Sequence, residues 1–83
     1  MQTPTSRAWF DARGFKVVAF SDVAHRDGYG WELVRLPQEV TAEAFLDDTT
    51  GAFTFRCLTT APLPFEVVHR FALEASEAVP PRP

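Results

Sequence analysis

The sequence predicts an α+β fold, in which a small antiparallel sheet of three to four strands carries a C-terminal amphipathic helix packed on one face. Two observations lead to this prediction. Short segments up to Leu58 alternate between apolar and polar side chains and are separated by turn-forming residues, whereas the last segment has apolar residues at helical spacing. The chain has 83 residues, so we expect one small domain over residues 1–83, with frayed ends at residues 1–5 and 79–83.

The first segment, residues 6–13, fits a two-turn helix that has Ser6 as its N-cap and ends before Gly14, which can adopt the left-handed conformation. A strand that ends in a turn over residues 11–14 is the alternative. Trp9 points inward in both cases. The sequence therefore predicts a core position for Trp9 and leaves the secondary structure of this segment open.

Two strands are expected next. Residues 15–20 are dense in β-branched and aromatic residues, and apolar side chains on both faces indicate a central strand that is covered on both sides. Residues 21–30 are polar and contain two glycines, which predicts a turn or a mobile loop. Residues 30–36 alternate again and form the second strand, which ends at Pro37 because proline has no N–H to donate to a sheet.

Residues 39–58 are the centre of the prediction, because they fit a strand, a tight turn and a second strand. In the second arm, residues 53–57, two phenylalanines and a cysteine fall on one side, as in a half-buried strand. Residues 47–51 are turn formers and end in a glycine that can take positive φ. The first arm, residues 40–46, is predicted as a strand, with a helix as the alternative because this segment is also rich in helix formers.

The last segment, residues 65–79, has the periodicity of an amphipathic helix that closes the core. Pro64 suits the beginning of such a helix. Leu73 is the one apolar residue outside the apolar arc. The residues predicted to face the sheet are Phe65, Val67, Val68, Phe71, Ala72, Ala75 and Ala78.

No catalytic, metal-binding or cofactor-binding motif stands out in the chain. Cys57 shares a side with two phenylalanines, so we expect a buried and unreactive thiol. His69 falls at the border of the polar arc of the helix, where a solvated histidine is the ordinary expectation. Asp22, His25 and Asp27 are the one cluster of metal-ligand types, but their spacing fits neither a zinc nor a calcium pattern. We therefore expect no enzyme, no cofactor and no metal.

Composition and charge narrow the class of partner. The net charge of −3 disfavours direct binding to nucleic acid, which depends on lysine and arginine at the phosphates.

A single cysteine excludes an internal disulfide, so the chain has no need of an oxidising compartment. The sequence shows neither a signal-peptide pattern nor an apolar run of membrane-spanning length. We therefore expect a soluble, cytoplasmic protein without a membrane partner.

A row of acidic residues is the candidate binding surface. Glu39, Glu43 and Asp47 are four residues apart, so they share a face whether the segment is a helix or a strand. In a strand, Phe45 has the same parity and is expected among them as an exposed aromatic anchor, and Asp48 follows. These five residues are the predicted partner-binding site. The alternative is an edge strand that its charges merely keep soluble.

Two functions follow from these expectations. The first is a non-enzymatic protein-binding module, a small acidic inhibitor, immunity-type or phage-type adaptor protein that docks a basic surface of a protein partner through the acidic row. The alternative is a small-molecule or substrate-binding domain with a pocket between sheet and helix and residues 21–30 as its lid. A homodimer through a sheet edge is compatible with both.

Overall fold

The computed structural model of the chain describes residues 6–79 and confirms the α+β class. The frayed ends predicted at residues 1–5 and 79–83 lie outside the described residues, except for Val79. The alternative of a helix over residues 39–47 is wrong, because this segment is a strand. In chain order, the elements are α1 (Ser6–Asp11), β1 (Phe15–Asp22), β2 (Gly28–Arg35), β3 (Glu39–Asp47), β4 (Phe53–Cys57) and α2 (Phe65–Ala78).

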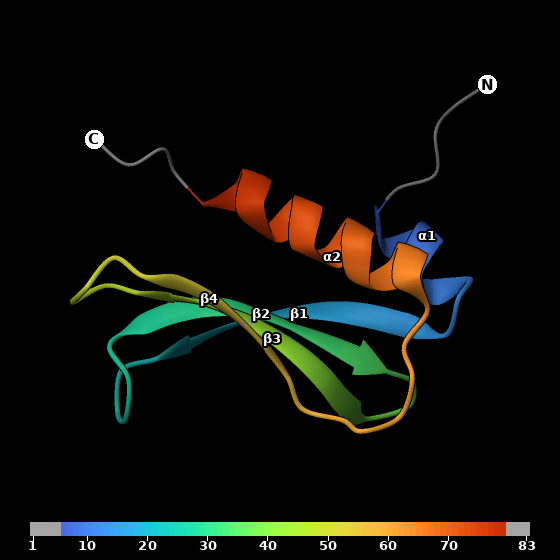
Figure 1. The fold of residues 1–83 in the computed structure, drawn as a ribbon, viewed down its shortest axis with the longest axis horizontal. Coiled ribbons are helices and arrows are strands. Elements are labelled where there is room, and N and C mark those ends of the chain that lie inside the picture. Colours follow the sequence, from blue (N-terminus) through green and yellow to red (C-terminus); the bar gives the residue numbers. More distant parts are fainter. Residues whose placement is uncertain (1–5, 80–83) are drawn as a thin grey trace.

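The four strands form one antiparallel sheet in the order β1-β2-β3-β4, so β1 and β4 are its two edges. Both helices lie on the same face of this sheet, with α2 running across it and α1 at one end (Figure 1). The turn predicted between β3 and β4 is present, and Gly51 has the positive φ of 78° that this turn requires. Within residues 6–79, the sheet therefore has one face covered by helices and one face without helices.

The hydrophobic core lies between α2 and the sheet. Val67, Phe71 and Ala75 lie one turn apart on α2, and all three are buried. Phe65 departs from the predicted apolar arc, because its side chain is 83% exposed at the beginning of the helix. The buried residues that pack together in this core are Phe10, Phe15, Leu33, Ala42, Ala44, Val67, Phe71 and Ala75.

The first segment is a helix, so the strand alternative for residues 6–13 is wrong. Gly14 follows it with a φ of 81°, as the helix prediction required. Ser6 is the first helical residue and not the N-cap, and its hydroxyl donates a hydrogen bond to Glu74 of α2. Phe10 is the residue of α1 that is buried in the core, while Trp9 packs against the margin of that core.

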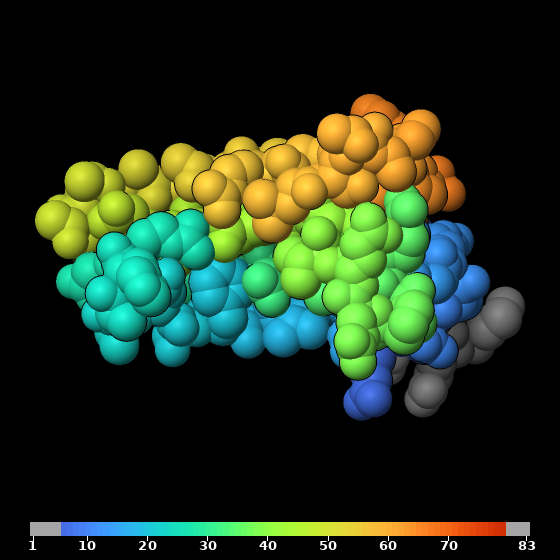
Figure 2. Space-filling model, turned by 90° about the horizontal axis from the view of Figure 1, so that it is seen from below, coloured from blue at the N-terminus to red at the C-terminus, as the bar shows by residue number. Residues whose placement is uncertain are grey.

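Two predictions about β1 and the segment after it are wrong. β1 is an edge strand whose residues are mostly exposed, and not a central strand covered on both sides. The predicted loop over residues 21–30 is shorter, because β1 continues to Asp22 and β2 begins at Gly28. The remaining loop, residues 23–27, stands on the sheet face without helices (Figure 2, cyan). It therefore does not cover the space between sheet and helix.

Candidate functional site

The exposed edge of β4 is the candidate functional surface. All five residues of this strand are exposed, and β3 is its one neighbour in the sheet of the described residues. The Leu58 N–H donates to the Thr41 carbonyl at 2.8 Å, which fixes the direction of the backbone groups at the end of β4. Because these groups alternate along an antiparallel strand, the N–H and C=O groups of Phe53, Phe55 and Cys57 point away from β3. No strand of the described residues pairs with them.

The side chains on the helix side of this edge are apolar and partly uncovered. Phe53 is 38% exposed and Phe55 is 48% exposed. The Phe53 ring contacts Trp31 with ring centroids 6.4 Å apart, and the Phe55 ring contacts Phe71 with centroids 6.3 Å apart. The inner side of each ring therefore packs on the core, while the outer side is available to a partner.

Helix α2 leaves this edge open because the residues that face it are short. Ala72 lines a hollow of about 90 Å³ together with Phe53 and Phe55. Val68 and Ser76 lie one turn away on either side of Ala72 and share its face of the helix. Side chains of this size do not overhang the backbone of β4, so a further strand has access to it.

Few of the usual protective features of an edge strand are present on β4. Its outward-pointing backbone groups belong to two phenylalanines and a cysteine, none of them charged and none a proline. Arg56 is the charged residue of the strand, and its side chain lies on the opposite side of the sheet, 3.7 Å from Glu43. The length of five residues is the protective feature that remains.

Cys57 is exposed, so the prediction of a buried thiol is wrong. It does lie on the same side of β4 as the two phenylalanines, but the end of the edge strand extends beyond the area that α2 covers. Its thiol donates a hydrogen bond to the Thr59 carbonyl at 3.4 Å. His69 is exposed on α2, as predicted, and its ring stacks on Phe65 with centroids 6.1 Å apart.

A β-bulge divides the predicted acidic row. The pairing between β2 and β3 slips by one residue at Thr41, which is an extra residue on β3. The slip reverses the alternation of side chains, so Glu39 lies on the helix side, 3.6 Å from the Arg35 guanidinium. Glu43 and Asp47 lie on the other side of the sheet. The prediction that the three acids share one face is therefore wrong.

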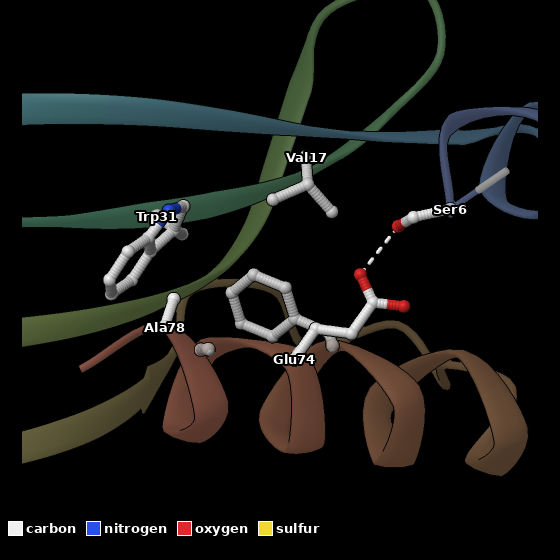
Figure 3. Close-up of a pocket in the computed structure, with 7 residues that line it drawn as sticks. Ser6, Val17, Trp31, Glu74 and Ala78 are labelled. Carbon is white, nitrogen blue, oxygen red and sulfur yellow. Dashed lines mark hydrogen bonds between the residues drawn. The ribbon is translucent and has the colours of Figure 1, made fainter. Parts of the chain in front are cut away.

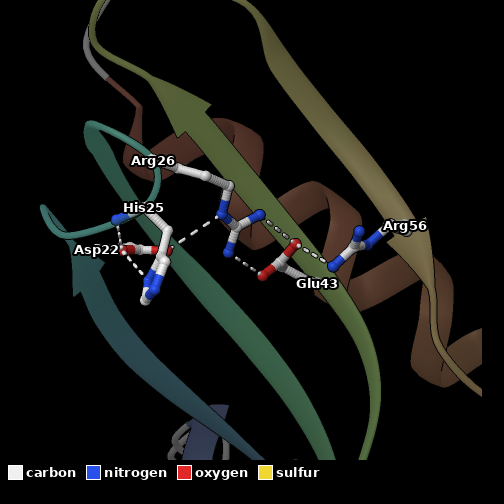
Figure 4. A network of polar contacts seen from close by, with 5 residues as sticks. All are labelled: Asp22, His25, Arg26, Glu43 and Arg56. Carbon is white, nitrogen blue, oxygen red and sulfur yellow. Dashed lines mark hydrogen bonds and ion pairs between the residues drawn. The ribbon is translucent and has the colours of Figure 1, made fainter.

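Glu43 is buried, although it was expected to be exposed. Figure 4 shows its carboxylate between Arg26 and Arg56. Arg26 donates two hydrogen bonds to its carboxylate, at 3.0 and 2.8 Å, and a further one to Asp22 at 3.2 Å. The Glu43 side chain is 7% exposed and the Arg26 side chain 37% exposed. The carboxylate is thus held inside the protein by two arginines, Arg26 and Arg56, and is not available to a partner.

Phe45 is 4% exposed, so it is not the exposed anchor that was predicted. Phe20, Gly30 and Phe45 stand in one row across three strands. The glycine has no side chain, and the two rings stack above it with centroids 6.0 Å apart. The Arg26 guanidinium covers the Phe45 ring at 4.1 Å from its centroid. This cluster explains how aromatic side chains are buried on the face without helices.

The two remaining acids of the predicted site lie at the turn between β3 and β4. The Asp47 carboxylate accepts the backbone N–H groups of Thr49 and Thr50 at 2.8 and 3.1 Å, so it holds the turn. Asp48 is exposed, and its backbone N–H donates to the Asp27 carbonyl at 2.7 Å. Of the five predicted contacts, Glu39 and Asp48 therefore remain as exposed acids, one near each end of β4.

In the buried network around Glu43, Arg26 and Glu43 stabilise the charged forms of each other's side chains. Hydrogen bonds from Arg26 hold the pKa of the Glu43 carboxyl below its ordinary value, although burial acts in the opposite direction. The same bonds raise the pKa of Arg26. The pKa of Asp22 is lowered chiefly by the backbone N–H of His25, and Arg26 contributes further. Glu43 and Arg26 are therefore both charged at neutral pH.

Replacing Glu43 with glutamine should lower the stability of the fold at neutral pH and have a smaller effect in acid. A carboxyl whose pKa is lowered by folding stabilises the folded chain fully above its unfolded pKa, which is 4.5 for glutamate. That contribution is lost as the pH falls through the lower pKa of the folded state. We expect the urea midpoints of Glu43→Gln and the parent chain to differ at about pH 7 and to converge towards about pH 3.

Glu39→Gln is the matched control, because the Glu39 side chain is 50% exposed and its partner Arg35 is 3.6 Å away. An exposed ion pair of this kind contributes little to stability. We expect its urea midpoint to follow that of the parent chain at both pH values. A difference between Glu43→Gln and the parent chain that grows in acid would show that the Arg26 contacts do not favour the charged carboxylate.

A cavity of about 210 Å³ lies between α2 and the β1 side of the sheet (Figure 3). Val17, Trp31 and Phe71 contribute apolar walls, and the hydrogen bond between Ser6 and Glu74 bounds one side. Pockets for drug-sized ligands usually have volumes of about 300 to 1,000 Å³. This cavity is smaller, so it gives little support to a drug-sized ligand between α2 and the sheet.

Comparison with known proteins adds no family to this description: no protein-family model, curated protein or solved structure matches the chain. Within residues 6–79, neither helix is long and apolar enough to cross a membrane.

Proposed function

We propose that this chain is a non-enzymatic protein-binding module that docks an extended segment of a partner protein along β4. The observation that carries the proposal is the combination of outward-pointing backbone groups with the half-exposed rings of Phe53 and Phe55. When a strand is added to a sheet, main-chain hydrogen bonds supply affinity and side-chain contacts supply specificity. The β4 edge offers both kinds of contact in one place.

The two exposed acids favour a partner with basic residues around an apolar segment. Glu39 accepts a hydrogen bond from the Thr59 hydroxyl at 3.3 Å, just beyond the end of β4. Asp48 lies in the turn before β4. Basic residues of the partner that lie opposite Glu39 and Asp48 would raise its association rate and help to set its register on β4. A small acidic inhibitor, immunity-type or phage-type adaptor protein is the class of protein that fits this proposal.

Photo-cross-linking inside the cells that make the chain tests the proposal. Phe55 is replaced with a benzoyl-phenylalanine, which keeps an aromatic ring at the half-exposed position. We expect a covalent adduct with a second polypeptide after illumination, because the outer side of this ring lies where a docked strand would pack. The adduct is measured as a shifted band and identified by mass spectrometry.

Val23 provides the matched control, because its side chain is 83% exposed but lies in the loop on the other face of the sheet. The same photo-reactive residue at this position should give no discrete adduct. Equal labelling from both positions would mean random collision, and an absence of adducts at position 55 would remove the support for a binding role of β4.

A further inference from the structure

We infer that the segment that docks on β4 is β4 of a second copy of this chain, paired antiparallel about a two-fold axis at Phe55. The inference rests on the proposed function of the β4 edge and names a second copy, in place of a basic partner, as the chain that docks there. Closed two-fold dimers are the commonest oligomers, and they require a surface that is complementary to itself. The edge of β4 meets this requirement in its backbone and its side chains.

The backbone groups of the edge match those of a second copy in one register. Three residues point their N–H and C=O groups outward, and Phe55 is the central one. A two-fold axis at Phe55 places Phe55 opposite Phe55 of the second copy, and Phe53 opposite Cys57 of the second copy. Each of these pairs exchanges two hydrogen bonds in an antiparallel ladder, so all the outward groups of both edges find partners.

The side chains are compatible with this register on both sides of the sheet. On the helix side, the exposed rings of Phe53 and Phe55 meet apolar residues of the second copy, which favours cross-strand aromatic pairing. On the other side, Arg56 lies opposite Thr54 of the second copy, so no like charges face each other directly. Glu43, 3.7 Å from Arg56, offsets the charge of that arginine within its own copy.

The other edge of the sheet is less suited to pairing with itself. The first part of β1 is flanked by α1, since Phe10 and Arg7 of this helix and Val17 of β1 line one common hollow. Lys16 adds a charge near that end of the strand, and charge is a usual protection of edges. On β4, by contrast, the α2 residues that line the hollow beside the two phenylalanines are the alanines Ala72 and Ala75. We therefore assign the interface to β4.

Sedimentation equilibrium of the full-length chain measures the dimer directly. We expect the mass to rise from one copy towards two over a range from about 1 µM to about 1 mM. Adding salt should strengthen the dimer, because each copy has a net charge of −3 and salt screens the repulsion. A complex held by a basic partner on the acidic chain would respond in the opposite direction.

Two substitutions at Cys57 test whether the dimer depends on the outward-pointing N–H of this residue. Cys57→Pro removes an outward-pointing N–H, whereas Cys57→Val keeps it and remains apolar. Cys57 is exposed, so the fold of the single copy should persist in both variants, as checked by circular dichroism. We expect Cys57→Pro to raise the dissociation constant of the dimer at least about tenfold and Cys57→Val to change it about twofold or less.

Disulfide trapping tests the register. In Phe53→Cys, the new thiol should lie opposite Cys57 of the second copy at a Cα separation of about 5.5 Å, which suits a disulfide. Oxidised glutathione accepts the two electrons and two protons released when each such bond forms. We expect a covalent dimer from Phe53→Cys and none above background from Thr54→Cys, whose side chain lies on the other side of the sheet.

Taken together, these experiments distinguish a failure of the two-fold dimer from a failure of the proposed protein-binding function. Mass doubling that is weakened by Cys57→Pro, together with trapping in Phe53→Cys, supports the two-fold dimer. A single-copy mass at every concentration overturns it, as does a dimer that is indifferent to Cys57→Pro and forms no disulfide in Phe53→Cys. If the chain is monomeric while position 55 cross-links to a different polypeptide in cells, the dimer fails and the protein-binding function stands. If neither experiment gives a complex, both fail.

Discussion

Replacing Phe71 with alanine should destabilise the fold by about 3 to 5 kcal/mol, the usual cost of removing a large buried aromatic side chain. Phe71 is 1% exposed and lies at the centre of the contact between α2 and the sheet. Its ring also supports Phe55 of β4, with centroids 6.3 Å apart. In a domain of this size, such a loss approaches the whole free energy of unfolding, and chemical denaturation measures it.

Leu73→Ala is the control for this prediction, because it also shortens an apolar side chain to alanine, two residues away on the same helix. Leu73 is 49% exposed and does not belong to the core cluster. We expect a loss below about 1 kcal/mol, as is usual for surface positions. Equal losses in the two variants would mean that α2 does not pack on the sheet through the face that contains Phe71.

Gly30→Ala should destabilise the fold by about 3 kcal/mol or more, at the upper end of overpacking effects. A Cβ atom at this position would lie 2.1 Å from the Ala44 carbonyl oxygen and 3.0 Å from the Phe45 Cα. Both neighbours belong to the backbone of β3, so the two central strands would have to separate. The stacking of Phe20 on Phe45 above the glycine would be disturbed as well.

Glu32→Ala tests whether this effect is specific to Gly30. Glu32 is two residues further along β2 and points to the same side of the sheet. Shortening its side chain adds no atom between the strands, so we expect a change below about 1 kcal/mol. Thermal or urea unfolding of the two variants in parallel gives the comparison. A mild effect of Gly30→Ala would indicate that β2 and β3 can move apart at little cost.

Local sequence patterns were sufficient to predict most of the fold. The alternation in residues 53–57 and the helical spacing in residues 65–78 depend on neighbours in the sequence, and both elements are present. The position of β1 in the sheet depends on which strands pair with it, and this information is not local. Its apolar residues on both faces predicted a central strand, but β1 is an edge. On the face without helices, Phe20 of β1 packs on Phe45 of β3 instead.

The candidate site was harder to predict because it depends on one irregular residue and on strand order. Glu39, Glu43 and Asp47 would share one face in a regular strand, but the bulge at Thr41 makes β3 irregular. A glycine inside a strand can signal a close approach of neighbouring groups, so the Gly-Tyr-Gly sequence of β2 was the available clue to the burial of Phe45. No comparable clue shows that β4 is an edge, since only the order of strands determines it.

Cross-linking yield at position 55 in living cells, compared with the yield at position 23, is the most direct test of the claim that β4 is the binding surface. Both side chains are exposed, but only Phe55 lies beside the outward-pointing backbone of an edge strand. We expect a discrete adduct from position 55, whether with a second copy or with another protein, and none from position 23. An adduct from position 23 alone, or no adduct from position 55, would contradict the claim.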